Sequence, residues 1–133
     1  MALTLVAFMA ATAAPAAAHN QTPDRARPAQ RITLTNSDNG RSVTASTGDR
    51  IEVRLTGYPE NKLTWTWSTP ASSDSAVLRR TAGRMAPNGD ASAAFHAEHP
   101  GTATITAQRS CHHDADHVCP MVITPWKATV QVK

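Results

Sequence analysis

The sequence predicts an all-β domain, built as an antiparallel β-sandwich of seven or eight strands. Three observations support this class. Apolar and polar residues alternate within several short segments. Gly, Pro, Asn and Asp separate these segments about every 8–12 residues, a spacing typical of β-sandwiches. No window of about 11 residues repeats its apolar positions with the period of a helix.

The clearest strand is 50–56, in which apolar side chains alternate with charged or polar ones. We expect Ile51, Val53 and Leu55 to face the core, and Arg50, Glu52 and Arg54 to face solvent. The same alternation predicts strands at 31–35, 42–45, 63–67, 92–97, 102–107 and 126–132, with a weaker candidate at 76–81. Trp65 and Trp67 share one face of their strand, so at least one of them is expected in the core.

Composition limits the kinds of protein to consider. The chain has 133 residues, of which 41% are hydrophobic and 17% are charged, which suits one globular domain. Its formal net charge of +3 comes from 13 Lys and Arg against 10 Asp and Glu, spread along the whole chain. We therefore exclude a disordered polyelectrolyte, a multidomain enzyme and a multi-span membrane protein. Neither nucleic-acid binding nor membrane-surface binding is predicted.

The first 18 residues predict export. They hold no charged side chain and end in Ala16-Ala17-Ala18 after an apolar stretch, which is typical of a secretory signal peptide. A transmembrane anchor is the alternative, but 18 residues interrupted by Pro15 barely reach the length of about 20 that a bilayer requires. Residues 19–30 contain two prolines and predict a flexible leader, so the folded domain is 31–133. The expected location is secreted or periplasmic, outside the cytoplasm.

A cysteine and histidine segment near the C-terminus permits two interpretations. Cys111 and Cys119 are the only cysteines, and an even number in an exported protein favours a disulfide. His112, His113 and His117 lie between them, and thiolates with imidazoles are ligands for zinc or copper. A disulfide removes the thiolate ligands. We therefore predict a disulfide-linked polar hairpin tip, with weak metal binding by the histidines as the alternative.

Several residues along the predicted strands resemble one known family. They are Gly48-Asp49, the alternating Ile51, Val53 and Leu55, Trp65, Phe95, the segment 101–105, and Pro125-Trp126. This arrangement resembles the chagasin-type inhibitors of papain-like cysteine proteases. The resemblance implies an immunoglobulin-like β-sandwich in which three loops at one end enter the protease cleft, and it covers about 100 residues of the chain.

The resemblance assigns protease contacts to three loops. The first family loop reads N-P-T-T-G-[YF]-x-W and corresponds to 58–65, where Pro59 and Trp65 are kept but the asparagine, both threonines and the glycine are replaced. The second corresponds to 83–89. The third, R-P-W, corresponds to 124–126 without its arginine. The implied contact residues are Tyr58, Pro59, Glu60, Asn61, Lys62, Pro87, Asn88, Pro125 and Trp126. Core packing is the alternative for Trp126.

Two functions remain open at this point. The first is inhibition of a papain-like cysteine protease, which requires shape complementarity and no catalytic group. The second is a non-inhibitory extracytoplasmic binding or structural module. An enzyme is not expected, because the chain holds no G-x-S-x-G, phosphate-binding loop or H-E-x-x-H motif. We expect a monomer without a cofactor.

Overall fold

The computed structural model describes residues 27–60, 63–113, 118–119 and 125–133. The predicted signal peptide and residues 19–26 of the predicted leader lie outside this range. No helix in the described segments is long and apolar enough to cross a membrane.

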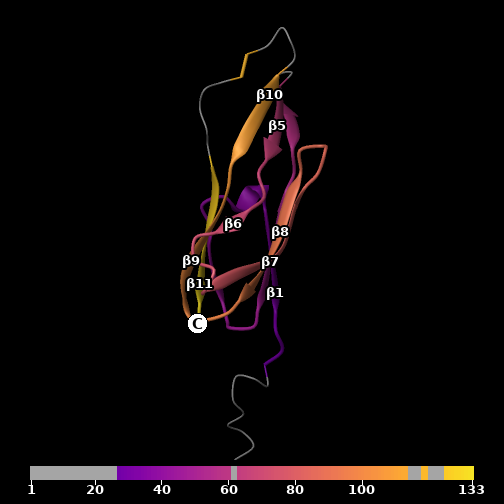
Figure 1. The fold of residues 1–133 in the computed structure, drawn as a ribbon. Helices are drawn as coiled ribbons and strands as arrows, with labels where there is room; N and C mark the ends of the chain where they lie inside the picture. Colours follow the sequence, from indigo (N-terminus) through magenta and orange to yellow (C-terminus); the bar gives the residue numbers. More distant parts are fainter. Residues whose placement is uncertain (1–26, 61–62, 114–117, 120–124) are drawn as a thin grey trace, which may run out of the picture.

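The described chain is almost entirely strand (Figure 1). Its elements are β1 (Arg31–Thr35), the 3₁₀ turn η3 (Asn36–Asp38), β2 (Ser42–Ala45), β3 (Arg50–Leu55), β4 (Tyr58–Glu60), β5 (Leu63–Trp67), β6 (Ala71–Ser72), β7 (Leu78–Met85), β8 (Ala91–Ala97), β9 (Gly101–Ala107), β10 (Arg109–His113) and β11 (Trp126–Val132). The all-β prediction is confirmed. The described segments form more strands than expected because β4, β6 and β10 are additional pieces.

Two four-stranded sheets form the sandwich, with strand orders β1-β3-β8-β7 and β2-β11-β9-β6. A smaller sheet, β10-β5-β4, extends from one end (Figure 1). Most neighbouring strands are antiparallel, as predicted. The pairs β1–β3 and β2–β11 are parallel. Between β1 and β3 the chain crosses to the other sheet through β2, the kind of crossover that a parallel pair requires, and β2 and β11 are far apart in the sequence.

The core lies between the two four-stranded sheets. One sheet contributes Leu34, Ile51, Val53, Leu55 and Phe95, and the other contributes Ala103, Ile105, Trp126 and Val130. The inward prediction for 50–56 is therefore confirmed. Trp67 joins this core, while Trp65 is buried within the smaller sheet. Together these side chains remove enough apolar surface from water to hold the sandwich closed.

Glu52 departs from its expected exposure. It lies on the outer face of the sheet as predicted, yet it is only 8% exposed because arginine side chains cover it. Its carboxylate accepts ion pairs from Arg50 at 3.0 Å, Arg54 at 3.3 Å and Arg31 at 3.5 Å. The hydrogen bond from Arg50 is the main cause that lowers the pKa of Glu52, and the charges of all three arginines outweigh the opposing effect of burial.

Asp49 fixes the point where the leader meets the domain. The residue is 2% exposed, and its two carboxylate oxygens accept hydrogen bonds from the backbone N–H groups of Gln30 and Ser46, both at 2.9 Å. Burial raises the pKa of Asp49, but these two hydrogen bonds and Arg27 outweigh it, so the net pKa is lowered. Gln30, assigned to the leader from sequence, is therefore bonded to the domain.

Candidate functional site

The end of the molecule from which the smaller sheet projects brings together described parts of two of the three loops that the family resemblance singled out. The smaller sheet, with β4, β5 and β10, extends to this end, and the β7–β8 turn lies beside it (Figure 1). We call this region the loop end. It gathers segments from 57 to 113, so its geometry depends on how the strands pair.

The β7–β8 turn is a tight, self-bonded hairpin loop. The N–H of Gly89 donates to the carbonyl of Ala86 at 3.0 Å, and the N–H of Ala86 donates to the carbonyl of Asp90 at 2.8 Å. Gly89 adopts a φ of +93°, which a side chain disfavours. Asn88 closes the loop by accepting the N–H of Asp90 at 3.1 Å. The sequence Pro-Asn-Gly thus produces a turn with one backbone conformation.

This turn is held against the smaller sheet by direct backbone contact. The N–H of Gly57 donates to the Asp90 carboxylate at 2.8 Å, and the N–H of Trp67 donates to the carbonyl of Gly89 at 3.0 Å. A Cβ atom on Gly57 would lie 2.8 Å from the carbonyl carbon of Gly89, and one on Gly89 would lie 2.8 Å from Cγ2 of Thr66. Glycine at both positions allows this approach, so the β7–β8 turn packs directly against the backbone of the smaller sheet.

An aromatic cluster supports the smaller sheet. The rings of Tyr58 and Trp65 stack with centroids 6.5 Å apart, and the Arg109 guanidinium lies 4.0 Å from the Trp65 centroid. Arg109 also donates a hydrogen bond to the Tyr58 hydroxyl. Sequence reasoning missed Arg109. Its only signal was its position shortly before Cys111, and its contact with Trp65 depends on the pairing of β10 with β5.

The Cys111–Cys119 disulfide is confirmed and joins β10 to the segment that follows it. Beside it, Nε2 of His112 lies 3.0 Å from the Thr66 hydroxyl, and the ring is exposed. His113 lies in β10, and His117 lies outside the described residues. Within the described part of the chain, no three His, Cys, Asp or Glu residues are placed to hold a metal. Metal binding by the histidines stays an untested alternative.

Most described contact candidates stand at the surface. Pro59, Glu60, Pro87, Asn88 and Pro125 are exposed, and Tyr58 is half-buried beneath Arg109. Asn61 and Lys62 lie outside the described residues.

Trp126 requires a correction. The resemblance implied that it covers a partner's surface, but it is 1% exposed and belongs to the core. Its Nε1 donates to the carbonyl of Thr35 at 3.1 Å, which satisfies the indole nitrogen inside the domain. Trp126 is therefore a core residue and not an exposed contact residue.

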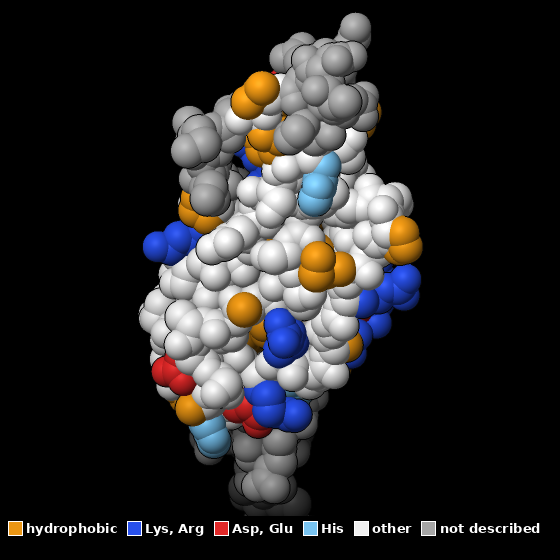
Figure 2. All heavy atoms as spheres, turned by 45° about the horizontal axis from the view of Figure 1, so that its top comes forward, with side chains coloured by type: hydrophobic (Ala, Val, Ile, Leu, Met, Phe, Trp, Pro, Cys, Tyr) orange, Lys and Arg blue, Asp and Glu red, His pale blue; other side chains and the backbone are white. Residues whose placement is uncertain are grey.

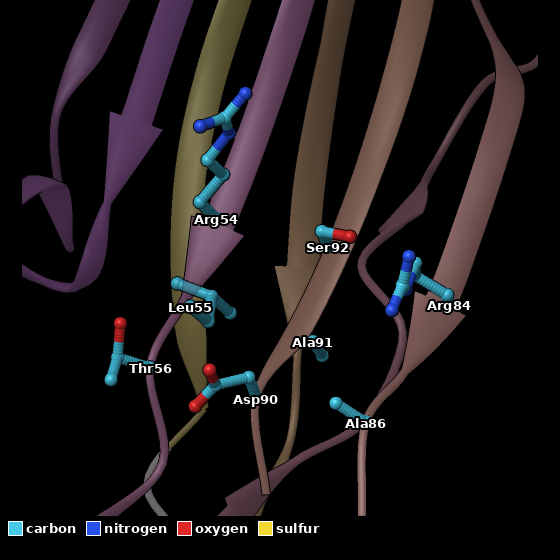
Figure 3. A pocket seen from close by; sticks show the side chains of 8 residues that line it. All are labelled: Arg54, Leu55, Thr56, Arg84, Ala86, Asp90, Ala91 and Ser92. Carbon is cyan, nitrogen blue, oxygen red and sulfur yellow. The ribbon is translucent and has the colours of Figure 1, made fainter. Parts of the chain in front are cut away.

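Two surface hollows lie close to the loop end. One, of about 430 Å³, is lined by Tyr58, Trp67, Arg109 and Pro125 together with Asn36, Ser37, Asn39 and the edge of Trp126. Its aromatic rings, amides and guanidinium suit contact with a partner's side chain. The other, of about 400 Å³, opens on the outer face of the sheet β1-β3-β8-β7, where Arg54, Ser92 and Arg84 line it (Figure 3).

No protein-family model and no curated protein sequence matches the chain. Solved structures do match it. A cysteine protease inhibitor from Entamoeba histolytica aligns with a TM-score of 0.52 and 15% identity, over 78% of this chain and 96% of that one. The inclusion body protein PixA from Burkholderia cenocepacia aligns with a TM-score of 0.54 and 8% identity, over 80% and 98%. The chain shares their fold. The resemblance to chagasin-type inhibitors is thereby confirmed for the fold, and identities this low carry nothing further.

Proposed function

We propose that this protein inhibits papain-like cysteine proteases by inserting its loop end into the active-site cleft. The exposed residues of β4 and of the β7–β8 turn make the contacts, with Pro59, Glu60, Pro87 and Asn88 foremost. Inhibition of this kind blocks substrate by shape alone, so the proposal assigns no catalytic role to any residue. A cysteine protease inhibitor is among the proteins that share this fold.

The observation that carries the proposal is the direct backbone contact between the β7–β8 turn and the smaller sheet. Gly57 and Gly89 let the backbone before β4 lie close to the β7–β8 turn, and the Asp90 carboxylate accepts a hydrogen bond from the N–H of Gly57. Because hydrogen bonds already fix the β7–β8 turn against Gly57 and Trp67, ordering these residues on binding costs little conformational entropy. A preformed turn of this kind suits insertion into a cleft that is itself largely rigid.

The proposal also includes export. The apolar, uncharged residues 1–18 act as a signal peptide, and the protein works outside the cytoplasm. The Cys111–Cys119 disulfide supports this location, since such bonds persist in oxidising compartments.

The decisive experiment titrates the purified protein against papain and against a cathepsin-like protease, with a fluorogenic peptide substrate. We expect an inhibition constant below about 1 μM, equivalent to about −8 kcal/mol. Pro87→Trp places a large ring on the exposed turn and is expected to weaken inhibition at least about tenfold through overpacking at the interface. His99→Trp, at the opposite end of the sandwich, is the matched control and should leave the constant unchanged. No inhibition at about 10 μM, equivalent to about −7 kcal/mol, would refute the proposal.

A second candidate is a non-inhibitory binding module on the same fold. Two observations favour it. Trp126, which the family resemblance places at the interface, is buried here. PixA, an inclusion body protein, shares the fold at a similar TM-score. The same titration separates the candidates, because the binding module leaves both proteases fully active at every concentration.

A further inference from the structure

The outer face of the sheet β1-β3-β8-β7 carries arginines in two rows. The strand register brings together residues that are far apart in the sequence. One row is Arg31, Arg50, His96 and Arg79, and the other is Thr35, Arg54, Ser92 and Arg84. Along β3 the rows are four residues apart, or about 13 Å. We call this surface the arginine face.

Positive charge dominates the arginine face. Its five arginines meet two carboxylates, Glu52 beneath Arg31, Arg50 and Arg54, and Glu98 beside Arg79 and His96. The ion-paired arginine side chains are 49–69% exposed, whereas the Glu52 and Glu98 side chains are 10% and 26% exposed. The carboxylates therefore lie beneath and orient the guanidiniums, which face solvent. On the face shown in Figure 2, basic side chains are likewise more prominent than acidic ones.

The second row borders the hollow of about 400 Å³. Figure 3 shows Arg54, Ser92 and Arg84 on three neighbouring strands, with the Ser92 hydroxyl between the two arginines and directed toward Arg84. Arg84 is exposed and makes no ion pair with any residue that the structure describes. Asp90 also lines the hollow, but its oxygens accept hydrogen bonds from Gly57 at 2.8 Å and from Asn88 at 3.1 Å.

We propose that the arginine face binds a sulfated polysaccharide, with one sulfate group held by Arg54, Ser92 and Arg84. Guanidinium groups bind tetrahedral oxyanions through paired N–H donors, and a hydroxyl between them adds a third donor. The Cα atoms of the two arginines are two strands apart, or about 10 Å, so both side chains are long enough to reach one group between them. Arg54 points along β3 toward Glu52 in Figure 3, and it turns toward Ser92 when the sulfate binds. The first row then meets further sulfates along the same chain.

The side chains between the two rows favour a polysaccharide over other polyanions. They are the small groups of Thr33, Ala94 and Ala82, together with Glu52, whose carboxylate the arginines cover. Single-stranded nucleic acids are bound mainly through stacking on aromatic side chains, and the two rows and the side chains between them on this face contain no Phe, Tyr or Trp. Protein partners require an apolar or aromatic anchor at the centre of the interface, which these small residues do not provide. This inference is independent of protease inhibition.

The test is a calorimetric titration of the full chain with a heparin hexasaccharide at low salt. Wild-type protein is expected to bind, with an affinity that falls as salt rises because ion pairs are screened. Arg54→Gln with Arg84→Gln should weaken binding at least about tenfold, since charge-assisted contacts are lost. Lys127→Gln removes one exposed charge from β11 in the opposite sheet and should change binding less than about twofold.

Four results would overturn the inference. The first is no binding of the hexasaccharide at low salt. The second is an equal loss in Lys127→Gln and in the arginine variant, which assigns binding to net charge alone. The third is saturable binding of inorganic sulfate that the hexasaccharide does not exceed, which assigns the site to a free ion. The fourth is equally tight binding of a duplex DNA of matched charge. Circular dichroism of each variant checks that it remains folded.

Discussion

Replacing Gly57 by alanine tests the backbone contact on which the loop end depends. The new Cβ would lie 2.8 Å from the carbonyl carbon of Gly89, 2.9 Å from the carbonyl oxygen of Trp65 and 3.0 Å from that of Asn88. All three are backbone atoms, so no side chain can rotate away. The β7–β8 turn must therefore move outward, and its hydrogen bonds to the smaller sheet must lengthen.

The sign of the change in the free energy of unfolding shows whether Gly57 and Gly89 are in close contact. Gly57 does not have a left-handed φ, so without crowding the alanine would stabilise the protein by about 0.4–1 kcal/mol through the unfolded chain. Overpacking costs about 1–3 kcal/mol. We expect a net loss of about 1–2 kcal/mol in the free energy of unfolding, which lowers the urea midpoint by about 1 M.

Urea denaturation followed by tryptophan fluorescence measures this loss, and amide hydrogen exchange at Trp67 reports the turn directly, because that N–H donates to Gly89. Gly83→Ala is the matched control. The nearest atom to its Cβ is the Thr69 methyl group, a side-chain atom that can move, so its cost should stay within about 0.5 kcal/mol. An unchanged or raised midpoint for Gly57→Ala, with unchanged exchange at Trp67, would refute the close approach of the two loops.

Three further predictions concern stability. Reducing the Cys111–Cys119 disulfide, whose partners are 8 residues apart, should cost about 2.5 kcal/mol on the chain-entropy estimate, so a thermal melt with dithiothreitol should lie about 10 °C lower. An unchanged melting temperature would show that the bond adds no constraint. Asp49 has a folded-state pKa below its ordinary value of 3.8, so its stabilising contribution is complete above that value and is lost as the pH falls through the folded-state pKa. Asp49→Asn should therefore flatten the acid limb of stability against pH, and a limb as steep as in wild type would contradict this. Trp126→Ala should lower the free energy of unfolding in urea by about 3–5 kcal/mol, as expected for a core residue. A loss below about 1 kcal/mol would show that Trp126 is not part of the core.

Strands with a clean alternation were predictable, because burial of one face requires an apolar residue at every second position. The ranges 31–35, 42–45, 63–67 and 126–132 match β1, β2, β5 and β11 residue for residue. The candidate at 76–81 was displaced from β7, which spans Leu78–Met85. Beyond Leu78 that strand is exposed, so its residues carry no alternation to detect.

The loop end was only partly predictable. The Pro-Asn-Gly sequence indicates a turn, but nothing in it indicates that Gly89 contacts Gly57. β10 also left no signal, because its residues are polar and its pairing with β5 joins positions more than 40 residues apart. The arginine face has the same origin. Its charges are spread along the sequence, which argued against an anionic partner, and only the strand register collects them.

The parallel pairing of β2 with β11 has a consequence for how the chain folds during synthesis. β11 follows both β2 and β9 in the sequence, and it lies between them in the second sheet. A nascent chain that ends before residue 126 leaves β2 without a neighbour and β9 with an open edge. The second sheet therefore closes only once residues 126–132 are available, and the dominance of such distant pairings places the protein among slow-folding all-β domains. Until then its unpaired strands are open to any machinery that handles unfolded polypeptides.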